Sequence, residues 1–471
     1  MSIQKKRVKA SNLAQSSSNA FCESYGHSPL ESIAPFERDE IILGRRVGSG
    51  TFSSVYEIRQ FNLRSDQSKL YTEEQIAKRE ATVDSMKNGA KYVIKCLKDK
   101  LEDADDEDRF LCAAQDIVHE AEMLAALSHP NIITLQGVVA SRHKAFLDGA
   151  SQFFIILERL DCTLADKVES WTKENRAFNP SASFRRRLII SNIDSSGSGT
   201  SIEKGDSTNK TASKGAPSST LHSRLRVAAS LADAVEYLHS KGVIFRDLKP
   251  DNVGFDRKNQ LKLFDFGLAR FMPKYGDSYE DVFQMSNTGT PRYTAAEVIF
   301  QQPYNLKSDV YSLSVVVWEI LSLKKPFAKY KHREDLEKAL MKVDFRPLSI
   351  SQRWSQSVQD IVEKCLSRDL WARPKMSEVC TTLNECVSMG AEACESVNKR
   401  GLTDSTSNVG LSRSMRLPSR RVSQKLRSSF NGFERKQLNR QISLSISETS
   451  ATTADTIAEE FFLHDSLHAL R

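Results

Sequence analysis

Three polar side chains suited to phosphoryl-transfer chemistry stand at fixed short steps in "VIFRDLKPDNVGFD", residues 243–256. Asp247 could accept a proton from an attacking hydroxyl, Lys249 could hold a transferring phosphoryl group, and Asn252 could ligate magnesium through its side-chain oxygen. Asp265, in "LFDFGLA", follows a short apolar stretch and places a second carboxylate at a turn, where it could hold the same ion. Taken alone, each acid could equally be a helix cap or a turn former.

Two further candidate groups lie nearer the N-terminus. In "GSGTFSSV", Gly48 and Gly50 would let backbone N–H groups approach phosphates with no Cβ in the way, although ordinary hairpin turns also contain Gly-x-Gly. Lys95, in "YVIK", has apolar neighbours on an expected strand, where an unpaired ammonium would be costly. Glu120 could supply the anionic partner, whereas a lysine that snorkels to solvent is the alternative interpretation.

The elements that must position these residues fall into two groups. Alternating apolar residues in "RDEIILGRRVGSGTFSSVYEIRQF" predict two antiparallel strands joined by a glycine-rich turn. Further strands are expected at "KYVIKCL", "IITLQGVVA" and "FFIILE", and one helix over about 113–127. Helical patterns return at "LRVAASLADAVEYLHSKG" and from 308 to about 389. We therefore expect an α+β fold, with a small strand-rich lobe carrying one long helix, a larger mainly helical lobe, and a ligand cleft between them.

Four stretches show no sustained apolar period. Residues 1–40 are rich in Ser and Asn and predict a disordered leader. A polar insert over about 61–90 has room for one solvent-facing helix, and a low-complexity insert over about 172–220 is expected to be disordered. Residues 387–471 predict a Ser/Arg-rich, mostly disordered tail, which ends in a possible short amphipathic helix, "TIAEEFFLHDSLHALR".

Composition is that of a soluble globular protein with polar extensions, with 39% hydrophobic and 27% charged residues. The eight cysteines are scattered without a CxxC pair, which favours reduced thiols and an intracellular location, in the cytoplasm or the nucleus. No run approaches the roughly 18 apolar residues of a membrane span. The basic N-terminus lacks a following apolar segment, so we expect no secretory signal, while a transit peptide stays open.

The net charge of +7 comes from the tail. Residues 398–447 hold 11 Lys or Arg against 2 Asp or Glu, a surplus that exceeds the charge of the whole chain. This stretch has few aromatic residues between its basic ones, so we expect no specific nucleic-acid binding.

The order of the motifs resembles the eukaryotic protein-kinase family over about residues 41–386. A glycine-rich hairpin, a strand lysine, a helix glutamate, the Arg-Asp-x-Lys-x-x-Asn loop and Asp-Phe-Gly follow one another as in that family. The residue types at Lys249 and Thr290 resemble those of serine/threonine kinases. The tyrosine-kinase-like group of these kinases has stretches similar to "HPNIITLQGVV" and "WARPKMSEV".

The resemblance implies a bilobal kinase domain with an N-lobe over 41–160 and a C-lobe over 161–386. It implies ATP and Mg²⁺ as cofactors and proteins with Ser or Thr acceptors as substrates. Asp247 would be the catalytic base, with Lys249 beside it, and Asn252 and Asp265 would be the metal ligands. The nucleotide site would comprise Val47, Gly48, Gly50, Val55, Val93, Lys95, Glu120, Glu158 and Leu160.

The resemblance also assigns supporting contacts. Thr290 would contact Asp247 and Lys249, Glu297 would pair with Arg373, and Asp309 would hold the backbone of the catalytic loop. Leu157 would lie at the back of the adenine pocket, and the backbone of residues 158–160 would pair with adenine.

Several residues depart from the family pattern. Phe245 replaces a histidine and should pack against Phe266. Ser53 replaces a third glycine, Val93 an alanine and Ala296 a proline. Gly254 replaces a leucine beneath adenine and should leave space there unless Phe255 or another neighbour fills it. A pseudokinase or a signalling scaffold is therefore the alternative function.

Arg246 beside Asp247 resembles kinases whose activation segment is ordered by a phosphate group, added in some cases by an upstream kinase. The candidate acceptors are Ser278, Tyr279, Ser286 and Thr288, of which Ser286 and Thr288 lie at the more usual distance from "GT". In the tail, Ser419, Ser423 and Ser443 follow arginines, and we expect them to be phosphorylated as well.

Overall fold

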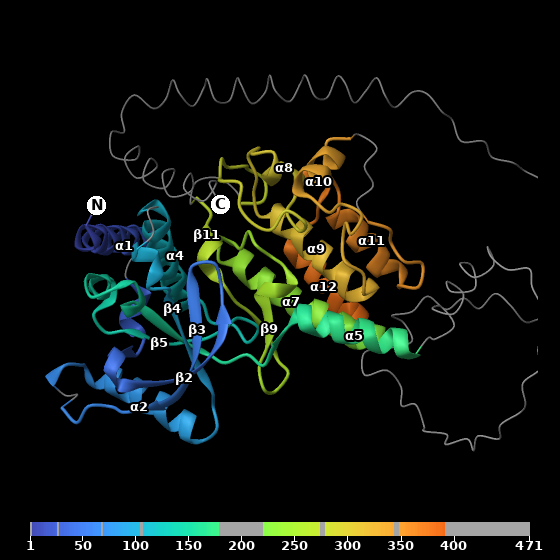
Figure 1. The fold of residues 1–471 in the computed structure, drawn as a ribbon. Helices are drawn as coiled ribbons and strands as arrows, with labels where there is room; N and C mark the ends of the chain where they lie inside the picture. Colours follow the sequence, from blue (N-terminus) through green and yellow to red (C-terminus); the bar gives the residue numbers. More distant parts are fainter. Residues whose placement is uncertain are drawn as a thin grey trace, which may run out of the picture. The chain divides into compact units, whose positions relative to one another are not determined.

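The computed structural model describes residues 2–25, 28–66, 69–103, 107–178, 220–273, 278–342 and 348–390. All of them belong to one compact unit of the chain, and they form the expected α+β arrangement of a strand-rich N-lobe and a helical C-lobe. Figure 1 shows the strands of the N-lobe at one end of this unit and the helices of the C-lobe at the other.

A six-stranded sheet forms the N-lobe, with strand order β1-β5-β6-β4-β3-β2. Its strands are β1 (Pro35–Phe36), β2 (Ile41–Ser49), β3 (Ser53–Phe61), β4 (Tyr92–Leu97), β5 (Leu135–Val139) and β6 (Phe154–Glu158). The hairpin β2–β3 turns at the glycine-rich stretch, as predicted. On β4, Lys95 lies opposite Val55 of β3 and Ile155 of β6, so it projects from an interior strand.

Helix α4 (Glu107–Ala126) carries Glu120 and packs against β4 and β5. It begins six residues before the predicted start at about residue 113. Glu107 and Asp108 lie in its first turn, where negative charge is stabilised by the positive end of the helix dipole. A short helix, α3 (Lys100–Asp103), precedes it.

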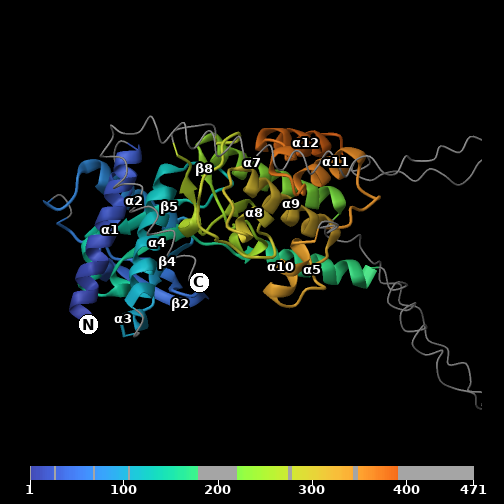
Figure 2. The same ribbon diagram turned by 90° about the horizontal axis from the view of Figure 1, so that it is seen from above.

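Most of residues 1–40 is ordered, which corrects the expectation of a disordered leader. Helix α1 (Ile3–Tyr25) packs against α4, and the two helices lie side by side in both Figure 1 and Figure 2. Its buried face is built mainly from small residues, chiefly Ala10, Ser11 and Ala14, and Phe21 is the one large apolar residue that it buries among those described, far fewer than an amphipathic helix usually has. Further along this stretch, β1 adds a parallel edge strand to β5.

The polar insert over 61–90 contains one helix, α2 (Glu73–Lys87). Thr72 caps its N-terminus and shares a capping box with Gln75. The side chain of Arg79, in the middle of this helix, is fully buried. It lies 2.6 Å from Glu40 and stacks over the rings of Phe36 and Tyr71. The helix is therefore not only solvent-facing, since a buried ion pair anchors it to the N-lobe.

The C-lobe is built around α9 (Lys307–Ser322), whose residues from Lys307 to Leu321 are all buried. Helices α7 (Leu221–Ser240) and α11 (Gln356–Cys365) pack against it, and α12 (Met376–Ser388) packs on α7. The other helices are α5 (Leu164–Phe178), α8 (Ala296–Ile299) and α10 (Arg333–Leu340). Short strands β7 (Cys162–Thr163), β8 (Val243–Ile244), β9 (Val253–Phe255), β10 (Leu261–Leu263) and β11 (Arg270–Phe271) complete the lobe.

The second insert and the tail are described only at their edges. Helix α5 runs to Phe178, so the first residues of the stretch expected to be disordered from 172 are helical. Residues 179–219 and 391–471 lie outside the described residues, together with Ser419, Ser423, Ser443 and the last amphipathic stretch. None of the described helices combines the length and hydrophobicity that a bilayer crossing requires.

Candidate active site

Lys95 lies at the centre of a charged cluster that joins the two lobes. Its Nζ atom is 2.6 Å from Oε2 of Glu120 on α4 and 2.9 Å from Oδ1 of Asp265, which follows β10. The Glu120 side chain is 3% exposed and that of Asp265 is 47% exposed. The structure thus brings together the predicted lysine and both of its carboxylates.

The charges of this cluster are strongly coupled. Burial alone would lower the pKa of Lys95, but Asp265 and Glu120 raise it above its ordinary value. The Lys95 ammonium in turn holds the pKa of Asp265 below its usual range. Burial raises the pKa of Glu120, against the opposing effect of Lys95. Lys95 is therefore a fixed cation, with the partly exposed carboxylate of Asp265 beside it.

Asp247 is held on both carboxylate oxygens. Its Oδ1 accepts hydrogen bonds from the backbone N–H and the hydroxyl of Thr290, both at 2.9 Å. Its Oδ2 lies 2.5 Å from Nζ of Lys249 and accepts a 3.0 Å bond from the amide of Asn252. Lys249 also reaches the Thr290 hydroxyl at 3.1 Å. The loop over residues 246–252 and the segment around Thr290 therefore meet at this carboxylate.

Asp309, at the start of α9, fixes the backbone beneath Asp247. It accepts hydrogen bonds from the N–H groups of Phe245 and Arg246 at 2.7 and 2.9 Å. Arg246 has a φ of 70°, a left-handed conformation that costs energy for a residue other than glycine. These two hydrogen bonds hold the loop in this conformation.

His239 at the end of α7 supports Asp309 and was not singled out in the sequence. Its Nε2 lies 3.2 Å from Oδ2 of Asp309, and its Nδ1 lies 2.7 Å from the hydroxyl of Tyr279. A histidine near the end of a helix gives little signal by itself, because its partners come from residues 279 and 309.

Gly289 lets the segment before Thr290 approach the loop at Arg246. Its φ is 100°, and an added Cβ would lie 2.5 Å from the carbonyl oxygen of Arg246. No other residue type fits this approach, which places the following Thr290 against Asp247.

Phe245 packs edge-on against Phe266, with ring centroids 5.1 Å apart and an interplanar angle of 82°. Both rings are buried. The aromatic residue that replaces the family's histidine thus keeps an apolar contact, as the sequence predicts.

The space expected above Gly254 is occupied, and the residue that fills it is Leu160. A Cβ added to Gly254 would lie 2.4 Å from Cδ1 of Leu160. Gly254 belongs to β9, whereas Leu160 follows β6 in the connection between the lobes. The volume that the family fills with a leucine at position 254 is therefore filled here by Leu160.

The remaining expected nucleotide-site residues lie along the N-lobe sheet. In the strand register, Gly48 faces Val55 and Val55 faces Lys95, which forms one row across three strands. Gly50 closes the turn by donating to the carbonyl of Ser53 at 3.0 Å. Val47 is exposed on β2, and Val93 is buried on β4 opposite Leu157. The Glu158 side chain pairs with Lys262 at 3.0 Å and accepts a hydrogen bond from the backbone N–H of Thr134 at 2.9 Å.

Asn252 and Asp265 have the right chemistry for magnesium, which prefers oxygen ligands. The Asn252 amide nitrogen donates to the backbone carbonyl and to Oδ2 of Asp247, which leaves its side-chain oxygen to face a ligand. Asp265 uses Oδ1 for Lys95 and is partly exposed. These residues fit a magnesium ion bound together with nucleotide phosphates.

Glu297 and Arg373 form a buried bidentate pair, with distances of 2.6 and 3.0 Å. Arg373 also donates to the carbonyls of Ser367 and Lys307, and Ser308 donates to Glu297. Burial would raise the pKa of Glu297, but Arg373 holds it below the ordinary value. The pair ties the end of the activation segment to the late helices, as the resemblance implies.

The candidate phosphorylation sites near "GT" differ in their surroundings. The Ser286 hydroxyl lies 3.3 Å from a guanidinium nitrogen of Arg246. Thr288 is buried, and its hydroxyl has no hydrogen-bond partner among the described residues. A phosphate on Ser286 would meet Arg246 directly, whereas Thr288 must first be exposed.

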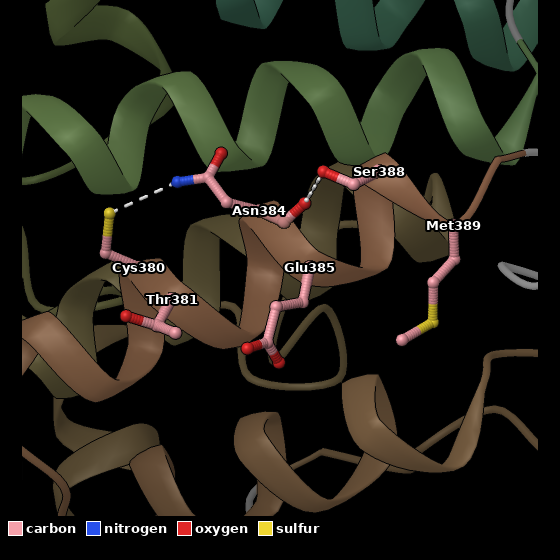
Figure 3. Close-up of a pocket in the computed structure, with 6 residues that line it drawn as sticks. All are labelled: Cys380, Thr381, Asn384, Glu385, Ser388 and Met389. Atoms are coloured by element: carbon pink, nitrogen blue, oxygen red, sulfur yellow. Dashed lines mark hydrogen bonds between the residues drawn. The ribbon is translucent and has the colours of Figure 1, made fainter.

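Two cavities lie apart from this cluster. One of about 570 Å³ lies on α12, where Figure 3 shows Cys380, Asn384 and Ser388 toward the neighbouring helix. Cys380 and Asn384 both donate to Asp233 of α7, at 2.8 and 2.9 Å, which marks a helix–helix contact. The other, of about 950 Å³, lies between α5, the end of α9 and the segment that follows it. Neither is lined by Asp247, Lys95 or Asp265.

Comparison with known proteins establishes the class that this fold and site define. The chain belongs to the protein tyrosine and serine/threonine kinase family, whose family model matches residues 41–383. It is 33% identical over 169 residues to dual specificity protein kinase shkC of Dictyostelium discoideum, which covers 36% of this chain and 33% of that protein.

Two relatives from Arabidopsis thaliana are named as serine/threonine kinases. Serine/threonine-protein kinase STY17 is 32% identical over 169 residues, covering 36% of this chain and 28% of the relative. Serine/threonine-protein kinase CTR1 is 31% identical over 166 residues, covering 35% and 19%. The matches thus span a third or less of these relatives. The expected resemblance to the protein-kinase family, and to its serine/threonine members, is confirmed.

Proposed function

We propose that this protein is an ATP-dependent protein kinase that transfers the γ-phosphoryl group to Ser or Thr hydroxyls of protein substrates. Asp247 accepts the proton of the substrate hydroxyl as its oxygen attacks the γ-phosphorus atom and the bond to the β-phosphate oxygen breaks. Lys249, 2.5 Å from Asp247, holds the transferring group. Lys95 binds the α- and β-phosphates and is held in place by Glu120.

Magnesium, when bound, supplies positive charge that neutralises the phosphates. Asn252 and Asp265 would hold it, since they offer an amide oxygen and a carboxylate at the entrance to the same cluster.

The main support for this proposal is that the contacts of Lys95 and those of Asp247 are formed together. Lys95 contacts Glu120 and Asp265 at the same time that Asp247 is bonded to Lys249, Asn252 and Thr290. The residues come from five separate parts of the sequence, and a protein that only binds partners has no need to bring them together.

The decisive experiment is a phosphotransfer assay with Mg-ATP and a degenerate peptide library, in which wild type is compared with Asp247→Asn. Loss of the base should reduce transfer by about 10²–10⁴-fold. Absence of any Asp247-dependent transfer would favour the alternative, a pseudokinase or scaffold. A truncation after Val397 separates these classes further, since a kinase domain keeps its transfer activity without the tail.

The activation segment provides a proposed regulatory site. We infer that a phosphate added to Ser286, by an upstream kinase or by the protein itself, pairs with Arg246 and orders the segment. The 3.3 Å contact between these two side chains supports this choice. Ser286→Ala should lower activity more than Thr288→Ala does, and mass spectrometry of the active protein should find phosphate on Ser286. Equal, full activity in both variants would contradict it.

An intracellular location, in the cytoplasm or the nucleus, is part of the same proposal. Five described cysteines, Cys22, Cys96, Cys162, Cys365 and Cys380, are thiols outside any disulfide, which is usual for proteins kept under reducing conditions. Imaging of a tagged full-length chain tests it, and an extracellular signal would refute it.

A further inference from the structure

Helix α1 lies against the two elements that complete the Lys95 cluster, α4 and the segment that follows Asp265. Three contacts follow its length: Lys9 to Glu107 at 2.9 Å, Ser17 to Gln115 at 3.5 Å, and Phe21 to His119 with ring centroids 6.2 Å apart. The paired residues are 98 positions apart in each case. The two helices therefore run parallel in a single fixed register.

The face of α1 turned toward the protein is closely packed. Ala10 and Ala14 are fully buried, and Lys6, one turn earlier, donates to the carbonyl of Glu102 at 3.1 Å. Because these alanines are small, the backbone of α1 approaches its neighbours closely. A side chain larger than Ala at position 14 has no room without moving α1.

The N-terminal end of α1 is fixed by charge. Arg7 donates to the Glu102 carboxylate at 2.7 Å, and the other oxygen of Glu102 accepts from the backbone N–H of Ala150. Near the other end, the Ser18 hydroxyl donates to the buried carboxylate of Glu122 on α4. Polar contacts at both ends thus fix the axial position of α1 on α4.

Phe21 connects α1 to catalytic geometry. Its ring contacts His119, the residue before Glu120, and also Phe271 of β11, with centroids 5.4 Å apart. The Nε2 atom of His119 lies 2.6 Å from the carbonyl oxygen of Ala269, four residues after Asp265. One aromatic side chain therefore packs on His119, next to Glu120, and on Phe271, six residues after Asp265.

We propose that α1 is a built-in positioning element, which holds α4 and the segment after Asp265 together so that Glu120 and Asp265 both meet Lys95. This inference rests on the proposed function, because it assigns α1 a role in nucleotide binding and transfer. The isolated helix is rich in Ser and Asn, which are weak helix formers, so its order depends on these contacts.

The test compares two full-length variants that receive the same charge at adjacent positions. Ala14→Glu places a carboxylate in the fully buried face, whereas Gln15→Glu places it on the exposed face. We expect Ala14→Glu to lower kcat/KM for peptide phosphorylation on the order of tenfold, within the usual range of coupling between two sites. Gln15→Glu should stay within about twofold of wild type.

The kinetic parameters distinguish positioning from loss of folded protein. If α4 moves between competent and incompetent positions, the apparent ATP affinity falls with the competent fraction, so KM for ATP should rise. A smaller fraction of folded molecules would lower kcat and leave this KM unchanged. Hydrogen exchange should show reduced protection in α4 of Ala14→Glu, with α9 and α12 as protected as in wild type.

A second pair of variants covers the case in which Ala14→Glu loses protection in α9 as well. Phe21→Ala removes the ring that joins α4 to β11, and Phe21→Leu keeps an apolar side chain there. We expect Phe21→Ala to raise KM for ATP and Phe21→Leu to restore most of the loss. The proposal is overturned if Ala14→Glu and Phe21→Ala both match Gln15→Glu in kinetics and in α4 exchange.

The outcome separates this inference from the proposed function. If wild type transfers no phosphate, the proposed function fails. The role of α1 is then decided by the affinity for a non-hydrolysable ATP analogue with Mg²⁺ and by α4 exchange. If wild type is active and the α1 variants are indistinguishable from it, only this inference fails.

Discussion

Two ion-paired clusters of this protein, one around Arg373 and one around Lys95, contain similar groups but differ in how much of their charge is exposed to solvent. Arg373 is fully buried, its pair Glu297 is 9% exposed, and backbone carbonyls accept its other hydrogen bonds. Lys95 also lies between carboxylates, but Asp265 remains 47% exposed. The first cluster has its hydrogen-bonding groups occupied within the protein, whereas the second leaves the Asp265 carboxylate partly exposed. A fully buried and fully hydrogen-bonded ion pair is typical of a structural contact. A charged cluster with an exposed carboxylate is typical of a functional site.

The largest effect on stability should come from opening the closed pair. Arg373→Met leaves the Glu297 carboxylate buried without its partner, which we expect to lower the free energy of unfolding by about 3–5 kcal/mol. Urea denaturation measures this difference. Lys375→Met serves as the control, because Lys375 lies on the surface, 3.7 Å from Glu280. Equal stability losses in Arg373→Met and Lys375→Met would contradict a special role of the buried Arg373–Glu297 pair in stability.

Removing the cation of the open cluster should separate activity from stability. Lys95→Met should reduce phosphotransfer by about 10²–10³-fold, the usual cost of a charge-stabilising donor. Its stability loss should be smaller than that of Arg373→Met, since the Asp265 carboxylate is 47% exposed and stays hydrated when Lys95 is removed. Transfer assays and denaturation of the same preparation measure both quantities. A variant that keeps its activity but unfolds easily would reverse the roles of the two clusters.

The apolar wall of the open site offers a finer test. Gly254→Leu would force Leu160 aside, and overpacking of this kind costs about 1–3 kcal/mol. We expect weaker binding of an ATP analogue, measured by calorimetry. The double variant Gly254→Leu, Leu160→Ala moves the bulk from one position to the other and should recover much of the affinity. No recovery would mean that Leu160 does more than fill this space.

The smallest of these effects concerns acid pH. Glu297 has a pKa below its ordinary value, so its contribution to stability is fully present above about pH 4.3 and is lost as pH falls through the lowered value. The stability difference between wild type and Arg373→Met should therefore narrow in acid. Thermal unfolding from pH 7 to pH 3 measures this change. A gap that widens in acid would show that the Glu297 charge is not what Arg373 stabilises.

The polar residues of the site could be predicted because their spacing is local or follows a fixed order. Asp247, Lys249 and Asn252 lie within six residues, and Lys95, Glu120 and Asp265 occur in recognisable surroundings. The lobes followed from periods of two and 3.6 residues in the apolar pattern. These features need no knowledge of distant partners.

Other features depended on partners that the chain brings from far away. Helix α1 was missed because, apart from Phe21, it buries mostly alanine and serine, which are also common in disordered segments. Its order comes from contacts with residues about a hundred positions later. Similarly, the space left by Gly254 is filled by Leu160, 94 residues earlier, and no local pattern connects the two.

The hold of Asp309 on the catalytic loop also affects how the protein assembles. Arg246 adopts a left-handed backbone conformation that costs about 1–3 kcal/mol. Hydrogen bonds to Asp309, which lies 63 positions later, offset this cost. The loop cannot keep this conformation until α9 is seated in its core. During refolding, helix content and compactness would therefore return first, and catalytic competence would follow only after the centre of the C-lobe has formed.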